Sequence, residues 1–234
     1  MKKFRVLLAA TAGVALSLSI GAGFASAAGG TISGTVKYDG TAPAPKKVEV
    51  TKDKEVCGLH QHFEENLIVD GSGGIANAVV IVKGAKGEMK PGDVTFDQKG
   101  CDYVPHVLAF EAGSTVNIVN SDGILHNIHT YSEKNPSFNM AQPKFKKVIK
   151  QTVAQPEVIK VTCDAHGWMH GWWVATDTPY FAVTDDKGNY SISGVPPGDY
   201  TVEVWQEKLG TQDQKASVKD GATATTNFSL KPKA

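Results

Sequence analysis

Four side chains that favour soft or borderline metal ions lie close together in the stretch VTCDAHGWMHG (161–171). They are Cys163, His166, Met169 and His170. Thiolate, imidazole and thioether groups together suit copper, and two imidazoles with one thiolate and a weak axial thioether are typical of a blue-copper electron-transfer site. One short loop cannot easily surround an ion, so we expect a further imidazole from a distant part of the chain.

A second stretch, STVNIVNSDGILHNIH (114–129), supplies such an imidazole. Strand-like residues from Thr115 to Asn120 are followed by an Asp-Gly turn and then by His126. The combined pattern is therefore strand, histidine, a long intervening segment, strand, and then Cys-x2-His-x2-Met. We expect the two stretches to meet around one ion.

The cysteine stretch is also compatible with different chemistry. A helix would place Cys163, His166 and His170 on one face, but the preceding EVIKVT (157–162) is strand-like and two glycines oppose a helix. Cys163 could also be a nucleophile, a buried inert thiol or a zinc ligand, and copper is favoured over zinc by ligand softness. Haem attachment is excluded because Cys-x-x-Cys-His does not occur.

The elements that must position these residues are predicted to be short β-strands. Runs of β-branched or aromatic residues alternate with turn signals such as Asp-Gly, Lys-Pro-Gly and Pro-Pro-Gly, and helical periodicity is not convincing in any window. The predicted strands are TISGTVKY (31–38), NAVVIV (77–82), HVLAF (106–110), TVNIVN (115–120), EVIKVT (157–162), NYSIS (189–193) and YTVEVW (200–205). Strands of this length and spacing are typical of all-β sandwiches or barrels.

Residues 103–129 and 161–171 resemble cupredoxins of the amicyanin and plastocyanin type, over about residues 88–177. The resemblance implies a Greek-key β-sandwich that binds one copper ion, and it implies that the Asn127 side chain ties the two ligand loops together and so orients the ligands. The ligands that it implies are His126, Cys163 and His166 in the equatorial plane and Met169 in the axial position.

The chain departs from the cupredoxin pattern at three histidines. His129 and His170 are extra imidazoles near the site, and His106 stands where the family usually has an apolar residue. If His129 or His170 displaced Met169, the site would be less blue and lower in potential. We therefore regard His129 and His170 as candidate extra ligands, although surface roles are favoured for both.

A second resemblance concerns the C-terminal part of the chain. The stretch FAVTDDKGNYSISGVPPGDYTVEVWQEKLG (181–210) resembles the second half of a carboxypeptidase-regulatory-like, or Cna-B-like, β-sandwich. Its first half is similar to two upstream stretches, 30–40 and 73–84. We therefore predict one sandwich, formed by residues 28–87 and 178–234, that is interrupted by the cupredoxin domain at 88–177. Two tandem domains are the alternative.

Cys57 and Cys101 are the other two cysteines, and both lie in polar, turn-like sequence. In an oxidising compartment they are expected to form a disulfide that links the interrupted sandwich to the inserted domain. The alternative is a second metal site that these cysteines form with His60, His62 and His106.

The first 27 residues predict a secretory signal peptide. A basic start is followed by an apolar run and by Ala25-Ser26-Ala27, which offers a cleavage site. We expect a periplasmic or secreted protein, and later stretches are too short in apolar residues to insert into a membrane. The formal net charge is 0, which does not indicate a nucleic-acid partner.

These features together predict a one-electron carrier that contacts other redox proteins transiently and is not itself an enzyme. His166 is expected to be the port at which a partner docks, with Trp168 on an apolar rim, while Trp172 and Trp173 are expected on opposite faces of a strand. The alternative is a copper-binding or copper-handling module on a β-sandwich scaffold. A subunit of a larger redox enzyme ranks last, and the oligomeric state is not predicted.

Overall fold

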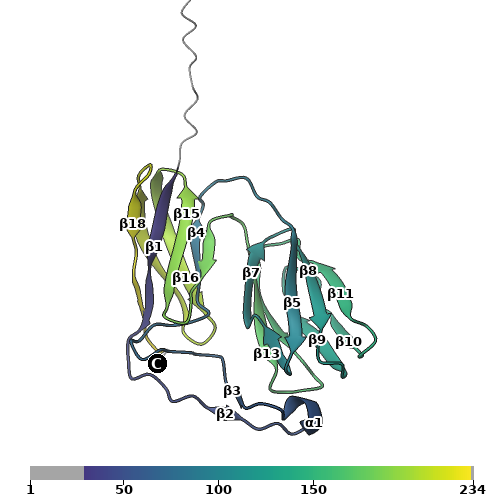
Figure 1. The fold of residues 1–234 in the computed structure, drawn as a ribbon. Coiled ribbons are helices and arrows are strands. Elements are labelled where there is room, and N and C mark those ends of the chain that lie inside the picture. The colour runs from purple at the N-terminus through teal and green to yellow at the C-terminus, as the bar shows by residue number, and fades with distance from the viewer. Residues whose placement is uncertain (1–28, 233–234) are drawn as a thin grey trace, which may run out of the picture.

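The computed structural model describes residues 29–232, and the regular secondary structure there is almost entirely β-strand, as predicted. Two β-sandwiches lie side by side, and a small separate segment crosses beneath them (Figure 1). The expected signal peptide, residues 1–27, lies outside the described residues. Within residues 29–232, no helix has the length and apolar character that a membrane crossing requires.

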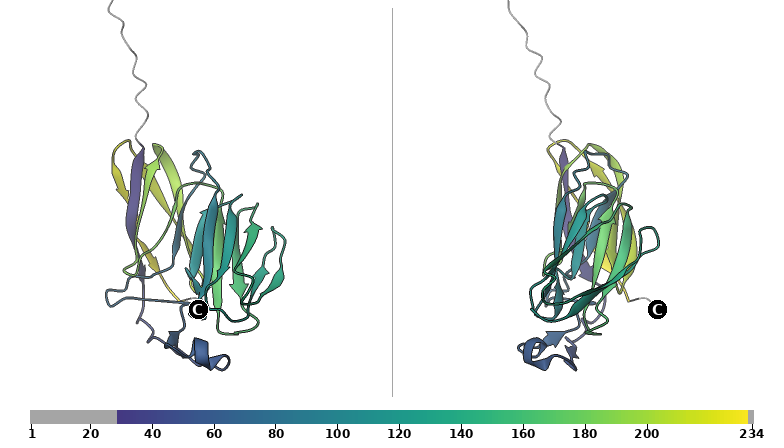
Figure 2. Two further views of the ribbon diagram at one scale, coloured as in Figure 1. Left: turned by 45° about the vertical axis from the view of Figure 1, so that its right-hand side comes forward. Right: turned by 90° about the vertical axis from the view of Figure 1, so that its right-hand side faces the viewer.

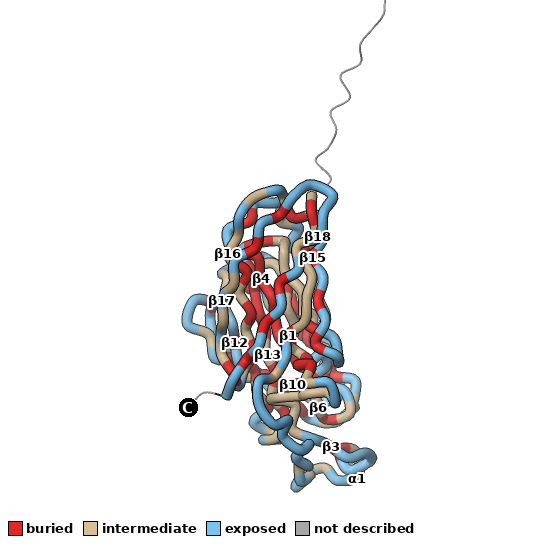
Figure 3. Tube along the Cα trace, turned by 90° about the vertical axis from the view of Figure 1, so that its left-hand side faces the viewer, coloured by how far each residue is buried: buried red, intermediate tan, exposed pale blue. Residues whose placement is uncertain are grey.

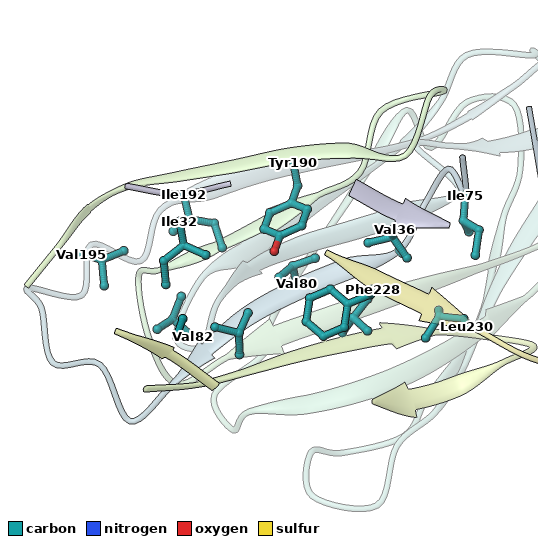
Figure 4. Close-up of a cluster of buried hydrophobic side chains, with 14 of the residues drawn as sticks. Ile32, Val36, Ile75, Val80, Val82, Tyr190, Ile192, Val195, Phe228 and Leu230 are labelled. Atoms are coloured by element: carbon teal, nitrogen blue, oxygen red, sulfur yellow. The ribbon is translucent and has the colours of Figure 1, made fainter. Parts of the chain in front are cut away.

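The first sandwich contains strands from both ends of the described chain. One sheet has β1 at its centre, and its strands are β15 (Asn189–Val195), β1 (Gly30–Tyr38), β18 (Thr223–Thr225) and β19 (Phe228–Leu230). The other sheet is ordered β14 (Phe181–Val183), β4 (Val79–Lys83), β16 (Gly198–Gln206) and β17 (Gly210–Val218). Figure 4 shows the apolar core between them, where Ile32, Val80 and Phe228 meet.

The second sandwich lies between β4 and β14 in the sequence. Its larger sheet is ordered β10 (Asn139–Gln142), β9 (His126–Tyr131), β12 (Glu157–Thr162), β13 (His170–Thr176) and β7 (Val107–Glu111). Its smaller sheet is ordered β11 (Val148–Thr152), β8 (Thr115–Asn120), β5 (Asp93–Lys99) and β6 (Asp102–Val104). The alternating burial of β8 shows why a period-2 sequence forms a strand here, since every second side chain enters the core.

The path of the chain matches the predicted insertion. The chain leaves the first sandwich after β4, forms the second one, and returns with β14, which pairs with β4. Insertion of this kind is tolerated where the ends of the inserted domain lie close together. The residue boundaries 28–87, 88–177 and 178–234 stay a prediction.

The two sandwiches share an apolar interface. Val79 and Ile81 of β4 meet Val107 and Val174 of the second sandwich there. In Figure 3 the buried positions run along β4 and β13, which both contribute to this contact. The interface fixes each sandwich against the other and so determines which side chains meet between them.

Residues 46–65, which we call the cap, form the segment beneath the sandwiches. The cap contains β2 (Lys47–Val48), which pairs with β3 (His62–Phe63), and a single-turn helix α1 (Lys54–Cys57). Figures 1 and 2 show it at the lower end of the molecule. The Lys-rich residues 46–53 contain only the short strand β2, and the chain then turns under the second sandwich.

Candidate metal centre

Three side chains converge at the lower end of the second sandwich. His126 is the first residue of β9, while Cys163 and His166 belong to the loop between β12 and β13. Cys163 Sγ lies 3.9 Å from His126 Nδ1 and 3.8 Å from His166 Nδ1, and the two Nδ1 atoms are 3.0 Å apart. The two stretches that the sequence analysis paired therefore do meet, through these three atoms.

The triangle formed by these atoms has the size of a metal site. A point equidistant from corners separated by 3.0, 3.8 and 3.9 Å lies about 2.1 Å from each of them, close to the ~2.0–2.3 Å of protein metal–nitrogen and metal–sulfur bonds. All three side chains are at most 2% exposed. Two imidazoles and a thiolate in this arrangement fit copper in a trigonal plane.

Met169 is placed by the fold of the ligand loop. Its N–H donates to the carbonyl of His166 at 2.9 Å, and its own carbonyl accepts from the N–H of Cys163 at 3.1 Å. These bonds turn the loop back on itself, and the Met169 side chain is buried in the same apolar cluster as Cys163. This position is compatible with the predicted axial role, which stays a prediction.

Each ring has a carboxylate behind it, and both carboxylates were missed by the sequence analysis. Asp122 Oδ2 lies 2.9 Å from His126 Nε2, and Asp53 Oδ2 lies 2.8 Å from His166 Nε2. A carboxylate at Nε2 holds the ring proton there and leaves Nδ1 free to face a metal. Asp122, four residues before His126, stood in the recognised turn, whereas no local pattern links Asp53 to His166.

The environment of Cys163 favours its thiolate form. Burial raises the pKa of the thiol, but hydrogen bonding from His126 and from the backbone near it outweighs burial and lowers the pKa overall. The backbone N–H of Asn127 points at Sγ at 3.5 Å. The thiolate is the form that binds metals, so the lowered pKa of Cys163 favours binding of a cation at this site.

The side chain of Asn127 joins the two ligand loops. Its Oδ1 accepts hydrogen bonds from the backbone N–H groups of Asp164 and Ala165, which follow the cysteine, and its Nδ2 donates to Asn139 Oδ1 at 2.7 Å. These contacts match the tie that the cupredoxin resemblance implied. They fix the start of the ligand loop against β9.

Replacement of Asn127 by alanine is expected to loosen the site without removing a ligand. We expect copper affinity to fall about 10–100-fold, the usual effect of losing an outer contact to a metal site. Competitive titration with a chelator measures the change. Asn66→Ala is a matched control, because the Asn66 side chain donates to Glu64 and not to the ligand loops. An equal loss in both variants would contradict the assigned role.

The prediction that a redox partner docks directly at His166 is wrong. The ring is fully buried, because Asp53 of the cap bonds to it and Trp168 lies over it with the ring centres 5.1 Å apart. Trp168 is itself held by a hydrogen bond from Nε1 to the carbonyl of Cys101 at 3.1 Å. The cap thus covers the face at which we expected a partner to reach the histidine.

The two candidate extra ligands lie in other networks. His129 Nδ1 is 3.2 Å from Asp164 Oδ1, and His170 faces Glu207 of the first sandwich. Among the described residues, the ligand group around Cys163 contains neither ring. His106 also faces Glu207, so this departure from the cupredoxin pattern belongs to the contact between the sandwiches.

Cys57 and Cys101 form the expected disulfide, with their sulfurs 2.08 Å apart. The bond fastens α1 of the cap to the turn between β5 and β6. The alternative metal site at these cysteines is therefore wrong, because neither sulfur is a free thiolate. His62 supports the same junction, with Nδ1 2.8 Å from Asp102 Oδ2 and Nε2 2.8 Å from the carbonyl of Cys57.

The ion pair between His106 and Glu207 predicts a pH dependence of stability. Burial alone would lower the pKa of His106, but Glu207 and Glu65 outweigh it and raise the pKa to about 9. A raised histidine pKa stabilises the fold fully below its unfolded value of ~6.5, and this contribution is lost as the pH rises through about 9.

In metal-free protein, we therefore expect wild type to exceed His106→Asn in free energy of unfolding by on the order of 2 kcal/mol at pH 6, and by much less at pH 10. Urea unfolding at both pH values measures the difference. A difference that is the same at both values would contradict the ion pair.

Comparison with known proteins gives one match to a family model. The family model described as carboxypeptidase regulatory-like domain matches residues 173–231, which form most of the first sandwich. A comparison with curated proteins finds no match.

Among solved structures, a purple cupredoxin from Nitrosopumilus maritimus is 21% identical, with a TM-score of 0.31, and the match covers 36% of this chain and all of that one. An amicyanin variant in its reduced Cu(I) form is 18% identical, with a TM-score of 0.33, over 42% of this chain and 98% of that one. A copper-containing nitrite reductase from Thermus scotoductus is 24% identical, with a TM-score of 0.32, over 41% of this chain and 25% of that one.

Proposed function

We propose that this protein is a type 1 copper protein that carries single electrons between redox partners. The observation that supports this most strongly is the buried triangle of His126 Nδ1, Cys163 Sγ and His166 Nδ1, whose dimensions fit one copper ion. A copper ion bound there would supply one-electron chemistry by alternating between Cu(I) and Cu(II). The chain's own residues account for the rest of the proposal.

The ligands are held in place before any metal binds. Asp122 and Asp53 fix the orientation of the two rings, and Asn127 fixes the backbone that follows Cys163. Because these side chains are buried and held by hydrogen bonds, they rearrange little when the charge at the site changes. Met169, folded back beside Cys163, is proposed as the weak axial ligand.

Copper handling is the less favoured function. The extra imidazoles of His129 and His170 motivated it, and both are engaged with carboxylates outside the ligand triangle. Burial of all three equatorial side chains also favours a site that retains its ion over one that hands it on. The regulatory-like sandwich, the periplasmic location and the transient redox partners remain part of this proposal.

Reconstitution with Cu(II) tests the function directly. Intense visible absorption is expected from a short copper–thiolate bond in trigonal geometry, and it should disappear on reduction and return on reoxidation. Equilibrium with redox dyes of known potential would show whether the change is reversible. A colourless copper complex, or one that loses its ion to a mild chelator on reduction, would contradict the carrier function.

A further inference from the structure

A second group of metal-binding side chains lies between the two sandwiches. Glu207 follows β16 and reaches from the first sandwich toward two histidines of the second. Its Oε1 lies 2.5 Å from His106 Nε2, and its Oε2 lies 3.6 Å from His170 Nε2. One ligand atom from each of the three residues lies within 4.8 Å of the others. Two imidazoles and a carboxylate therefore face a common point.

The remaining ring nitrogens face the kinds of group that usually lie behind metal-bound histidines. His170 Nδ1 donates to the carbonyl of Trp168 at 3.3 Å, which leaves its Nε2 available as a ligand. His106 Nδ1 lies 3.4 Å from Glu65 Oε2. Metal-binding histidines almost always present their second nitrogen to a carbonyl or a carboxylate, which fixes the tautomer.

His106 carries an unexplained polar atom. Its side chain is only 3% exposed, and within residues 29–232 its Nδ1 has no aligned hydrogen-bond partner. Burying such an atom unpaired is costly. With a cation at Nε2, the ring proton would reside on Nδ1, on the side of Glu65, and a small shift of that partly exposed carboxylate would complete a hydrogen bond.

The group also has an approach path. A pocket of about 380 Å³ is lined by His106, His170 and Glu65, together with Gly167 and Trp168 of the ligand loop. A site with three protein ligands keeps a position for water or another small ligand, and the pocket offers room for one. Carboxylates outnumber lysines in the pocket lining, with Glu49, Glu64, Glu65 and Asp102 against Lys46 and Lys47, and this balance favours a cation.

We propose that His106 Nε2, His170 Nε2 and the Glu207 carboxylate form a second metal site, for a borderline divalent cation such as Zn²⁺. Nitrogen and oxygen ligands without a thiolate suit Zn²⁺ rather than Cu(I). The site is separate from the copper triangle and does not depend on the proposed electron transfer. A cation there would bind both sandwiches at once, one residue along the chain from Met169.

Cobalt titration of copper-loaded protein that is kept reduced, and so colourless, as Cu(I) tests the site, since Co²⁺ is a coloured substitute for Zn²⁺. We expect one equivalent of Co²⁺ to bind with weak d–d absorption, and Zn²⁺ to displace it. His170→Asn and Glu207→Gln should each weaken binding at least tenfold. His170 is partly exposed, so its variant should fold even if loss of Glu207 disturbs the interface.

Two control variants keep the interpretation specific. Glu203→Gln removes a carboxylate on β16 that faces Lys83, and His60→Asn removes an exposed imidazole of the cap, so neither should change cobalt binding. Cobalt at Cys163 would show intense thiolate charge-transfer bands, so loading of the first site is distinguished from loading of the second. The proposal is contradicted if the protein does not bind cobalt, or if His170→Asn and Glu207→Gln both bind it as wild type does. The cluster would then be only an ion pair between the sandwiches.

Discussion

Replacement of Cys163 by serine is expected to abolish the visible absorption of the copper-loaded protein and to lower its copper affinity more than about 100-fold. Losing an outer contact already costs ~10–100-fold at metal sites, and this change removes the one soft anionic ligand of the triangle. The serine hydroxyl is a poor substitute because it is not ionised at neutral pH. Absorption spectra and chelator competition measure both effects.

The double variant Cys57→Ala/Cys101→Ala is the matched control for this prediction. This variant removes the two other cysteines of the chain, which form the disulfide, but keeps the triangle of His126, Cys163 and His166. We expect it to keep the full visible spectrum. Colour that survives in Cys163→Ser, or is lost only in the control, would place the copper elsewhere and overturn the proposed function.

The ligand triangle could be predicted because its signals are local. Cys163, His166 and Met169 lie in one loop, and the strand before His126 has the clean alternation that β8 shows in its burial. The step across the chain, from Cys163 to His126, relied on the need for a second imidazole from another strand end, and the family resemblance implied the same pairing. The structure places Cys163 Sγ 3.9 Å from His126 Nδ1, although nothing in the sequence between the two residues dictates this pairing.

The contacts from outside the second sandwich could not be predicted. Asp53 and His166 are 113 residues apart, and a lone aspartate in a Lys-rich loop carries no signal that it will bond to a histidine. The prediction for Trp172 shows the same limit. Strand alternation correctly placed Trp172 and Trp173 on opposite faces of β13, and Trp173 is fully buried. Trp172, however, packs against Trp205 of the first sandwich, a contact that alternation could not predict.

The cap changes how an electron would reach the proposed copper. Asp53 and Trp168 cover His166, so this ligand does not reach the surface. Access of a redox partner to His166 therefore depends on how firmly the cap is held. The Cys57–Cys101 disulfide is its covalent attachment to the second sandwich. Local opening of such a segment has its own free energy, separate from global unfolding.

Removal of that disulfide is expected to make the protein less stable and the copper more accessible. The cysteines are 44 residues apart in sequence, and closing a loop of this length stabilises a fold by about 3–4 kcal/mol in the chain-entropy treatment. If cap opening becomes easier by even ~2.8 kcal/mol, the open population rises about 100-fold, since about 1.4 kcal/mol corresponds to tenfold. Reduction of the Cu(II) protein by a bulky reductant should then accelerate strongly.

Val202→Ala separates the cap effect from general destabilisation. Val202 is fully buried in the core of the first sandwich, so truncating it lowers global stability while the cap keeps its disulfide and its bond from Asp53 to His166. Stopped-flow reduction should therefore be fast in Cys57→Ala/Cys101→Ala and unchanged in Val202→Ala. Equal rates in wild type and the disulfide variant would mean that electrons do not pass through His166. Electron transfer would then have to pass through another ligand, such as Cys163 and the strand β12 that precedes it.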